Sequence, residues 1–332
     1  MKKTTGLRKA GPRNRADQRA ELLLGALACV VLALIAGMLI FVFEKAWPSF
    51  SANGLAWFGS GGDVDQQLEE IFRSPADEPN YFIRTWPLLW ATALITISSV
   101  VIGTVVALLS AMFIVEFAPN SIRRVLEPVV RLLAAVPSVI YGLIGILVIV
   151  PFVGQHLITE GAKASVAGVI PLNGSSVGVG ILILTVMITP IMIAIVVDAL
   201  RAVPSGWSEG ALSLGINRWR ALWTVSVRAA RPAIVAAAVL ATARALGEAI
   251  MLAMVTGSIG FAPNPIDGPI FFAEPARPLG ATIVEYAEGL SVEPLAETMY
   301  AFSAVLLVSA AFMSFSGWYI RRSLRRYTLA PI

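Results

Sequence analysis

The chain has 332 residues, of which 57% are hydrophobic and only 14% charged, and its mean hydropathy is +0.78. A soluble domain is about 45–50% apolar and about 25% charged, so this sequence has too few polar residues to cover soluble cores. The single cysteine excludes a disulfide-stapled secreted domain, and the hydrophobicity excludes a disordered chain. The composition therefore indicates a polytopic membrane protein.

Charge-free apolar runs predict the membrane spans directly, because about 20 apolar residues cross about 30 Å of hydrocarbon as a helix. The runs are continuous and do not alternate with polar residues, which favours helices over a β-barrel. We therefore predict an all-α fold with six transmembrane helices. Their predicted ranges, within a membrane domain of residues 21–325, are about 22–43, 87–115, 129–152, 178–198, 230–258 and 298–320.

The basic residues predict the orientation, since cytoplasmic loops of membrane proteins carry an excess of Lys and Arg. With both termini in the cytoplasm, 19 of the 25 basic residues and six of the 21 acidic residues lie inside. Five basic and 14 acidic residues lie outside, so the formal charge of +4 divides into about +13 inside and −9 outside. The sequence thus predicts a multi-pass protein of the cell membrane with cytoplasmic termini, and the net charge gives no reason to expect a nucleic-acid partner.

The segments between the spans follow from this orientation. Residues 1–20 form a basic cytoplasmic tail, which could lie on anionic lipid or be disordered, and residues 326–332 form the cytoplasmic end. A signal peptide would have an apolar core of about 7–15 residues, so the longer first run predicts an uncleaved helix. The extracytoplasmic loops are predicted at 44–86, 153–177 and 259–297. The first and third are acidic, and each could bind a partner, line an entrance or be a solvated connection.

The inner loop 201–228 is the most informative connection. Trp207 to Leu214 is expected to form a short helix that Gly215 stops. A short helix with exposed Trp and Leu must bury them against lipid headgroups or a cytoplasmic partner, and we favour the partner. The chain lacks the Gly-Lys-Ser/Thr ending of a P-loop in a glycine-rich context, so any ATP would bind to another chain.

Arg244 and Glu248 are charged residues in the interior of a predicted span, away from its ends. Their i, i+4 spacing on the predicted helix 230–258 places them on one face, with Arg244 near mid-membrane. Charged residues inside a membrane are costly and by default mark a permeation path. A guanidinium binds phosphate, sulfate or carboxylate in a bidentate way, and a neighbouring carboxylate suits an anion that carries a proton, as hydrogen phosphate does. We therefore expect Arg244 to contact an anion while Glu248 orients it or accepts the phosphate proton. The alternative is a self-neutralising pair that only packs.

A second group of residues lies in the third predicted helix. Pro137, Ser138 and Tyr141 could form a gate or line the path, because a mid-span proline frees a backbone carbonyl, or they could form a simple packing kink. His156 and Cys29 have no partners for a metal site or for nucleophilic catalysis. We therefore expect neither a metal centre nor an enzyme active site.

Four blocks of sequence resemble known membrane transporters. Residues 209–215, running on to Val227, resemble the EAA loop of bacterial ABC importer permeases, which in that family forms the coupling helix that docks on the ATPase. Gly210 and Arg228 depart from the family pattern. In addition, the blocks 134–142, 244–248 and 283–288 resemble the PstC family of phosphate ABC importer permeases.

This resemblance covers about residues 20–325 and implies a type I ABC importer permease fold and ATP-driven phosphate import. It implies four kinds of partner: a second permease like PstA, an ATPase dimer like PstB, an extracytoplasmic phosphate-binding protein like PstS, and the lipid bilayer. It implies no cofactor on this chain, with ATP and Mg on the ATPase. It also implies that Arg244 and Glu248 take part in phosphate passage. The residues that would carry the coupling are Glu209, Ala211, Gly215, Arg218, Trp219 and Arg220. An importer of another oxyanion such as molybdate or sulfate, or an ATP-independent anion channel or secondary transporter, stays open as an alternative.

Overall fold

The structure is a computed structural model that describes residues 15–75, 77–166 and 168–325. Within these ranges the chain is helical and forms no strand beyond one bridged residue pair, Gly257 with Ala276, which confirms the all-α prediction. Six helical segments of the described part are long and apolar enough to cross a membrane, as predicted. Residues 1–14 and 326–332, which hold most of the predicted basic tail and the predicted cytoplasmic end, lie outside the described residues.

Long and short helices alternate along the chain. The long helices are α1 (Arg15–Asn53), α3 (Trp86–Met112), α8 (Val177–Arg201), α11 (Val227–Leu246) and α14 (Glu293–Arg325). The short ones are α2 (Val64–Phe72), α4 (Asn120–Ala134), α5 (Ser138–Ile144), α6 (Val150–Phe152), α7 (Glu160–Val166), α9 (Ser205–Ser213), α10 (Arg218–Ala221), α12 (Ile250–Val255) and α13 (Leu279–Glu285). Single π-helical turns at Gly145–Ile149 and Leu222–Ser226 join neighbouring helices, and those at Phe113–Phe117 and Val153–Leu157 end a helical segment. Short 3₁₀ helices lie at Gly54–Phe58, Pro265–Ala273 and Ala287–Gly289.

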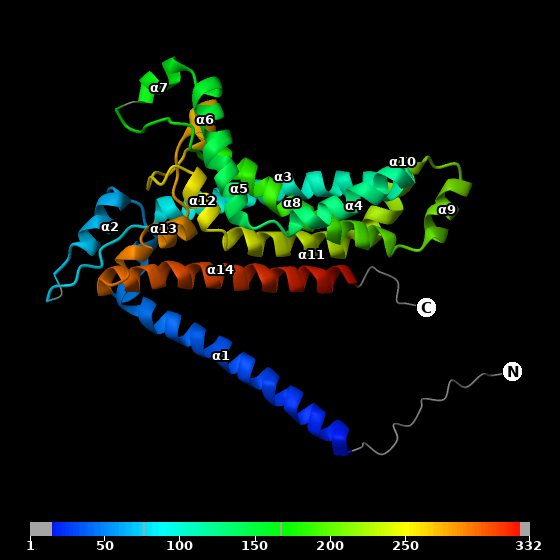
Figure 1. The fold of residues 1–332 in the computed structure, drawn as a ribbon, viewed down its shortest axis with the longest axis horizontal. Helices are drawn as coiled ribbons and strands as arrows, with labels where there is room; N and C mark the ends of the chain where they lie inside the picture. Colours follow the sequence, from blue (N-terminus) through cyan, green and yellow to red (C-terminus); the bar gives the residue numbers. More distant parts are fainter. Residues whose placement is uncertain (1–14, 76, 167, 326–332) are drawn as a thin grey trace.

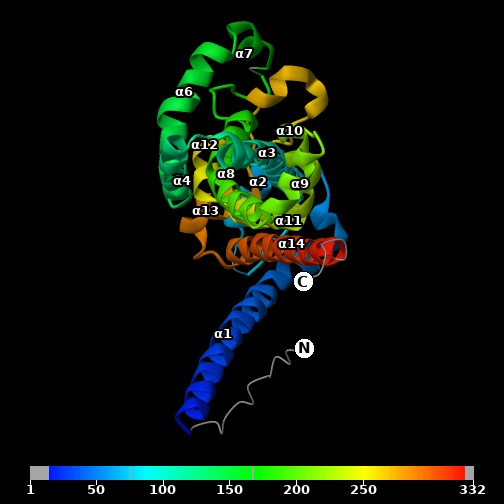
Figure 2. The same cartoon turned by 90° about the vertical axis from the view of Figure 1, so that its right-hand side faces the viewer.

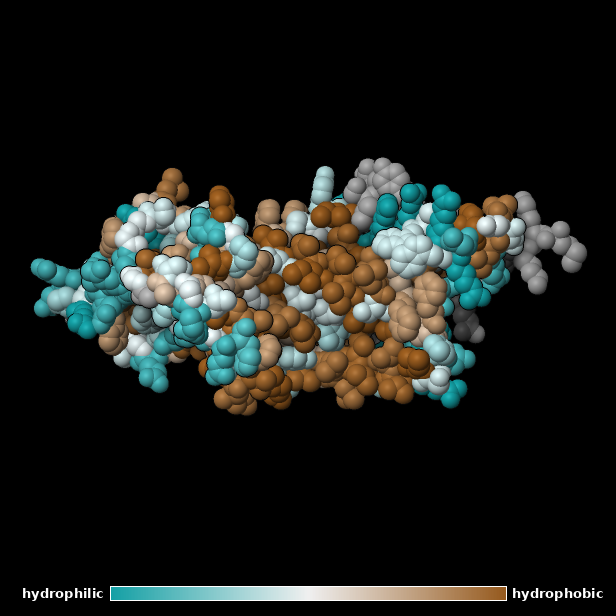
Figure 3. Space-filling view, turned by 90° about the horizontal axis from the view of Figure 1, so that it is seen from above, coloured by the Kyte–Doolittle hydropathy of each residue, from teal (hydrophilic) through white to brown (hydrophobic). Residues whose placement is uncertain are grey.

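Four long helices form a bundle in which α3, α8, α11 and α14 run side by side (Figure 1). Helices α9 and α10 lie at one end of this bundle, whereas α2 and α13 lie at the other. Viewed from above, hydrophobic residues cover the middle of the molecule and hydrophilic residues gather toward the two ends (Figure 3). This banding is the surface pattern that a helical bundle needs to cross a bilayer.

Helix α1 leaves the bundle at an angle, as Figures 1 and 2 show. It packs on α14 through its C-terminal half, where the rings of Phe41 and Tyr300 meet edge to face at 5.5 Å and Lys45 Nζ lies 3.8 Å from Glu293. Toward its N-terminus the apolar side chains are uncovered within this chain, and Leu22 is 73% exposed. The first span is therefore held to the bundle by one end.

The prediction of a continuous third helix at 129–152 is wrong. Helix α4 ends at Ala134, and a new helix begins at Ser138 and continues through α5, α6 and two π turns to Leu157. Pro137 has no N–H to donate and disfavours helical dihedrals at the residue before it, so the chain breaks there instead of bending. The predicted outer loop 153–177 is accordingly helical to Leu157, and it also contains α7.

The prediction of a continuous fifth helix at 230–258 is also wrong, because α11 ends at Leu246 and α12 begins only at Ile250. Gly247, a poor helix former, directly follows α11, and Glu248 and Ala249 complete the connection to α12. The other four predicted ranges lie within longer helical segments. These are α1, α3 with its π turn, α8 and α14.

Candidate translocation site

The break between α11 and α12 places a carboxylate inside the bundle. Glu248 is only 9% exposed, although it belongs to neither helix. Its Oε1 accepts a long hydrogen bond of 3.4 Å from the backbone N–H of Met251 in the first turn of α12. A carboxylate at this position suits the positive end of the short helix, where the first N–H groups lack helical partners.

Arg244 does not form the predicted pair with Glu248 on one helical face. Helix α11 ends at Leu246, so the two residues are not separated by one regular helical turn. Arg244 is exposed in this chain, whereas Glu248 is buried, and among the described residues neither has an ion-pair partner. The sequence prediction failed because it assumed a continuous helix through Gly247.

The structure brings the third span against the fifth, since α5 packs on α12. The Tyr141 hydroxyl donates a 3.1 Å hydrogen bond to the carbonyl of Leu133 and so spans the gap between α4 and α5. Pro137 caps the start of α5, and Ser138 is its first residue. Two of the sequence blocks singled out above therefore meet: the broken third span and the broken fifth span.

Close packing between α5 and α12 fixes this meeting point. A Cβ on Gly142 would lie 2.8 Å from the sulfur of Met254 and 3.1 Å from the Cα of Met251. A Cβ on Gly145, one turn further on, would lie 2.6 Å from a methyl group of Val255. Small residues let membrane helices approach this closely. The sequence interpretation did not assign these glycines a role, and their three-residue spacing was the available signal.

Helix α13 closes the same region from another side. A Cβ on Gly280 would lie 3.1 Å from the carbonyl oxygen of Glu248 and 3.4 Å from the Cα of Ala249. The preceding residue, Leu279, donates its backbone N–H to Thr92 Oγ1 of α3 at 2.9 Å. The backbone of the α11–α12 break is thus held between α12, α13 and the bundle. Sequence reasoning missed this contact, because Gly280 lies more than 30 residues from Glu248 along the chain.

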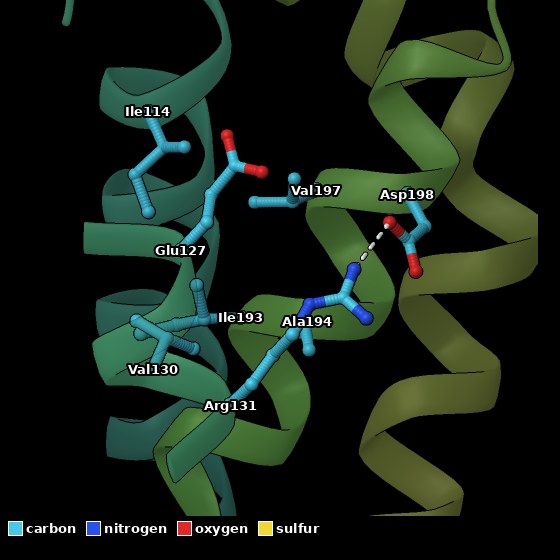
Figure 4. A pocket seen from close by; sticks show the side chains of 8 residues that line it. All are labelled: Ile114, Glu127, Val130, Arg131, Ile193, Ala194, Val197 and Asp198. Carbon is cyan, nitrogen blue, oxygen red and sulfur yellow. Dashed lines mark ion pairs between the residues drawn. The ribbon is translucent and has the colours of Figure 1, made fainter. Parts of the chain in front are cut away.

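A separate cavity lies between α4 and α8 (Figure 4). Its lining residues are Ile114, Glu127, Val130, Arg131, Ile193, Ala194, Val197 and Asp198. Arg131 reaches across it to Asp198 at 3.7 Å, and Arg201 binds Glu127 through both of its terminal nitrogens. The cavity contains neither Arg244 nor Glu248, and its charges are paired. It therefore lacks the free cation that an anion site requires.

At the opposite end of the bundle from α13, the predicted short helix after Pro204 is confirmed as α9. Gly215 follows it with φ = +79°, and the N–H groups of Gly215 and Ile216 donate to the carbonyls of Leu212 and Ala211. These two bonds are a Schellman motif, which explains why a glycine ends the helix. Asn217 then caps α10 by accepting the N–H of Arg220 at 2.8 Å.

Most residues of the predicted coupling surface face outward. Those that are exposed are Glu209, Gly215, Arg218, Trp219 and Arg220. Ala211 is buried against the chain itself, so it anchors α9. Leu214 is 83% exposed beyond the helix end, and the Trp219 ring lies 5.8 Å from that of Trp223. Together these residues form one exposed end of the bundle that mixes basic and apolar side chains.

Comparison with known proteins identifies relatives in membrane transport. Residues 99–327 match the family described as "Binding-protein-dependent transport system inner membrane component". The chain is 34% identical over 253 residues to the "Probable ABC transporter permease protein YqgH" of Bacillus subtilis, covering 76% of this chain and 75% of that protein. It is 28% identical over 323 residues to the "Phosphate transport system permease protein PstC 2" of Mycobacterium tuberculosis, covering 92% and 93% of the two chains.

Solved structures share the fold at lower identity. A chain of a bacterial alginate ABC transporter, in complex with an alginate-bound periplasmic protein, aligns with a TM-score of 0.58 at 15% identity, covering 97% of this chain and 100% of that one. A chain of the inward-facing MetNI methionine ABC transporter aligns with a TM-score of 0.51 at 20% identity, covering 71% and 93%. The fold is that of type I ABC importer permeases.

Proposed function

The chain belongs to the family of binding-protein-dependent transport system inner membrane components, and from this premise we propose that it is the permease subunit of an ATP-driven importer of inorganic phosphate. Its general role as an ABC importer permease follows from the family. The observation that carries the choice of an oxyanion is Arg244, an exposed cation of the fifth span with no carboxylate partner among the described residues. Several relatives are named as phosphate transport permeases.

In this proposal Arg244 binds the anion, and Glu248 accepts a hydrogen bond from its protonated oxygen. A guanidinium without an ion-pair partner keeps its donors available to phosphate oxygens, and it binds them strongly where water is scarce. Glu248 is buried at the break, so an unprotonated anion would meet an uncompensated negative charge there. Hydrogen phosphate can donate a hydrogen bond from its P–OH group to this carboxylate, whereas sulfate has no proton with which to do so. Tyr141, on the helix α5 that packs against α12, would line the path beside them.

The remaining path and the energy source would come from other subunits. Arg244 is exposed in this chain, so a second permease would supply the facing wall. The exposed end formed by α9 and α10 would dock on an ATPase dimer that carries ATP and Mg, which would place both termini in the cytoplasm. A phosphate-binding protein would deliver the substrate at the other end, to the acidic loops. In the predicted orientation those loops are extracytoplasmic.

The test is ATP-dependent uptake of labelled phosphate by proteoliposomes that contain this chain, a second permease, the ATPase and the binding protein. Arg244→Ala and Glu248→Gln should each reduce uptake about tenfold or more, which corresponds to about 1.4 kcal/mol or more of lost stabilisation. The matched control is Glu127→Gln, which removes a carboxylate from the α4–α8 cavity and should change uptake less than about twofold.

Three outcomes would contradict the proposal. Undiminished phosphate uptake in both site variants would remove Arg244 and Glu248 from the path. Uptake by this chain without any ATPase would reject ATP coupling and favour a channel or secondary transporter. Full competition by sulfate or molybdate, with little uptake of phosphate itself, would assign the importer to another oxyanion.

A further inference from the structure

A buried ion cluster lies at the external end of the bundle as we orient it, outside the site described above. Arg277 is 8% exposed, and its side chain contacts two carboxylates from distant parts of the chain. Its Nη1 lies 2.5 Å from Asp65 Oδ1 at the start of α2, and its Nε lies 2.9 Å from Glu285 Oε2 at the end of α13. We call Asp65, Ser258, Arg277 and Glu285 the Arg277 cluster.

Ser258 joins this cluster to the end of α12. Arg277 Nη2 donates to the Ser258 carbonyl, while the Ser258 hydroxyl donates to Glu285 and reaches the Ala253 carbonyl at 3.2 Å. Ser258 has φ = +53°, and no other non-glycine residue of the described part has a positive φ. Such a backbone persists only where its surroundings hold it. The cluster supplies that restraint.

The cluster also ties down the outer helix α2. Asp65 accepts the backbone N–H of Gly260 at 3.0 Å through its second oxygen, so it binds both Arg277 and the segment after Ser258. The exposed face of α2 carries Glu69 and Glu70, and its buried face packs on α14. Three segments far apart in the sequence therefore converge on one guanidinium.

Two short helices connect the cluster to the α11–α12 break. Helix α12 begins two residues after Glu248 and ends at Val255, three residues before Ser258. Helix α13 begins next to the break, where a Cβ on Gly280 would lie 3.1 Å from the Glu248 carbonyl oxygen. Its last residue, Glu285, belongs to the cluster. At 1.5 Å per residue each helix is about 10 Å long. A displacement of the cluster would therefore reach Glu248 through a single short helix, either α12 or α13.

We propose that Arg277 is a positioning residue for transport: by fixing the far ends of α12 and α13 to α2, the Arg277 cluster sets the position of Glu248 at the break. The inference rests on the proposed function, which places Glu248 in the path. Arg277 itself touches no substrate in this scheme. Its planar guanidinium reaches three segments at once, which a lysine could do only in part.

The first test measures the geometry at the break without phosphate. In full-length protein carrying Cys29→Ser, the variant Ala249→Cys introduces one reporter thiol beside Glu248, and its rate of modification by a membrane-impermeant maleimide is measured in membrane vesicles. Arg277→Gln should change this rate about fivefold or more, and Arg277→Lys should restore part of the original rate. Arg73→Gln, which breaks an exposed ion pair with Glu69 on α2, is the matched control and should leave the rate unchanged.

The second test measures phosphate uptake per assembled transporter. Arg277→Gln should lower the maximal rate about tenfold with an unchanged half-saturating phosphate concentration, and Arg277→Lys should recover part of the rate. Asp65→Asn keeps the side-chain shape and serves as a second variant should Arg277→Gln fail to fold. An unchanged modification rate, or an unchanged maximal rate in folded Arg277→Gln or Asp65→Asn, would overturn the proposal.

The two proposals fail in different ways. If Glu248→Gln transports phosphate normally while the reporter still responds to Arg277, the positioning contact stands and the assignment of Glu248 to the path is wrong. If Glu248→Gln loses transport while the modification rate of the reporter thiol is the same with and without Arg277→Gln, the assignment of Glu248 to the path stands and the positioning role is wrong.

Discussion

Helix α8 and the α11–α12 pair cross the same apolar layer in opposite ways. Helix α8 is unbroken despite Pro190, and most of its residues are buried in the chain. Hydroxyl groups of α8 donate hydrogen bonds to carbonyls of the same helix, as Thr189 does to the Thr185 carbonyl at 2.6 Å. The α11–α12 pair instead interrupts its hydrogen bonding and leaves a carboxylate at the gap. An unbroken span packs the bundle, whereas a broken one can present polar groups.

Small residues allow close packing in both regions. A Cβ on Gly180 of α8 would lie 2.8 Å from a methyl group of Thr256, and a Cβ on Gly103 of α3 would lie 3.3 Å from Thr189 Oγ1. A Cβ on Gly142 or Gly280 would likewise lie about 3 Å from the α11–α12 region. The two regions therefore differ in the break itself and in the buried carboxylate that it carries. From this contrast we expect damage to α8 to reduce stability, and damage around the break to reduce transport.

The largest effect on transport is expected from Gly142→Leu. The new side chain would collide with Met251 and Met254, forcing α12 away from α5 and moving Glu248 with it. Overpacking of this kind costs about 1–3 kcal/mol, and phosphate uptake per assembled complex should fall about tenfold. Gly161→Leu on α7, where a Cβ meets nothing within 4 Å, is the matched control. Normal uptake by Gly142→Leu would show that the α5–α12 contact has no role in transport.

A smaller effect on transport, but a clear one on stability, is expected from Leu184→Ala in α8. Leu184 is fully buried, so the substitution leaves a cavity. We expect a loss of about 2 kcal/mol, the low end for buried leucines, because the apolar alternative to the core is lipid instead of water. Thermal unfolding in detergent measures this loss, with exposed Leu182→Ala as the control. Uptake per folded complex should change less than about twofold, and a larger drop would mean that α8 also shapes the path.

The smallest effect is a pH dependence at the Arg277 cluster. Burial raises the pKa of Glu285 above its ordinary value, and the Asp65 carboxylate raises it further, although Ser258 and Arg277 act in the opposite direction. A carboxyl group whose pKa is raised on folding stabilises the fold below its unfolded pKa and loses that contribution as the pH rises through the folded pKa. Tyr286, whose ring lies beside Arg277, titrates far above this window.

The melting temperature of the wild type, relative to that of Glu285→Gln, should therefore fall slightly as the pH rises from about 4 toward neutral. Glu69→Gln on the exposed face of α2 is the control and should keep the wild-type slope. If the melting temperature of the wild type instead rises relative to that of Glu285→Gln as the pH rises, Arg277 outweighs burial at this carboxyl group.

Much of this architecture could be predicted from local patterns. The six spans follow from apolar length, and the helix before Gly215 follows from a glycine that can adopt a positive φ. The exposed Trp219 agrees with the resemblance of the inner loop to a coupling helix. The break at Pro137 was signalled by the proline but was interpreted as a kink. The break after α11 is marked in the sequence only by Gly247, and apolar residues continue on both sides of it, so a continuous helix was predicted.

The sequence by itself determined the class of protein, the number of spans and the residue types that suit an oxyanion, because hydrophobic length and charge are properties of short segments. Only the tertiary structure decided that Arg244 and Glu248 do not form one helical face, that α5 and α13 close on the break, and that Arg277 joins three distant segments. These facts depend on contacts between residues separated by many positions in the chain. The net charge of +4 illustrates this difference. Composition sets its value, whereas the fold decides which charged side chains form ion pairs.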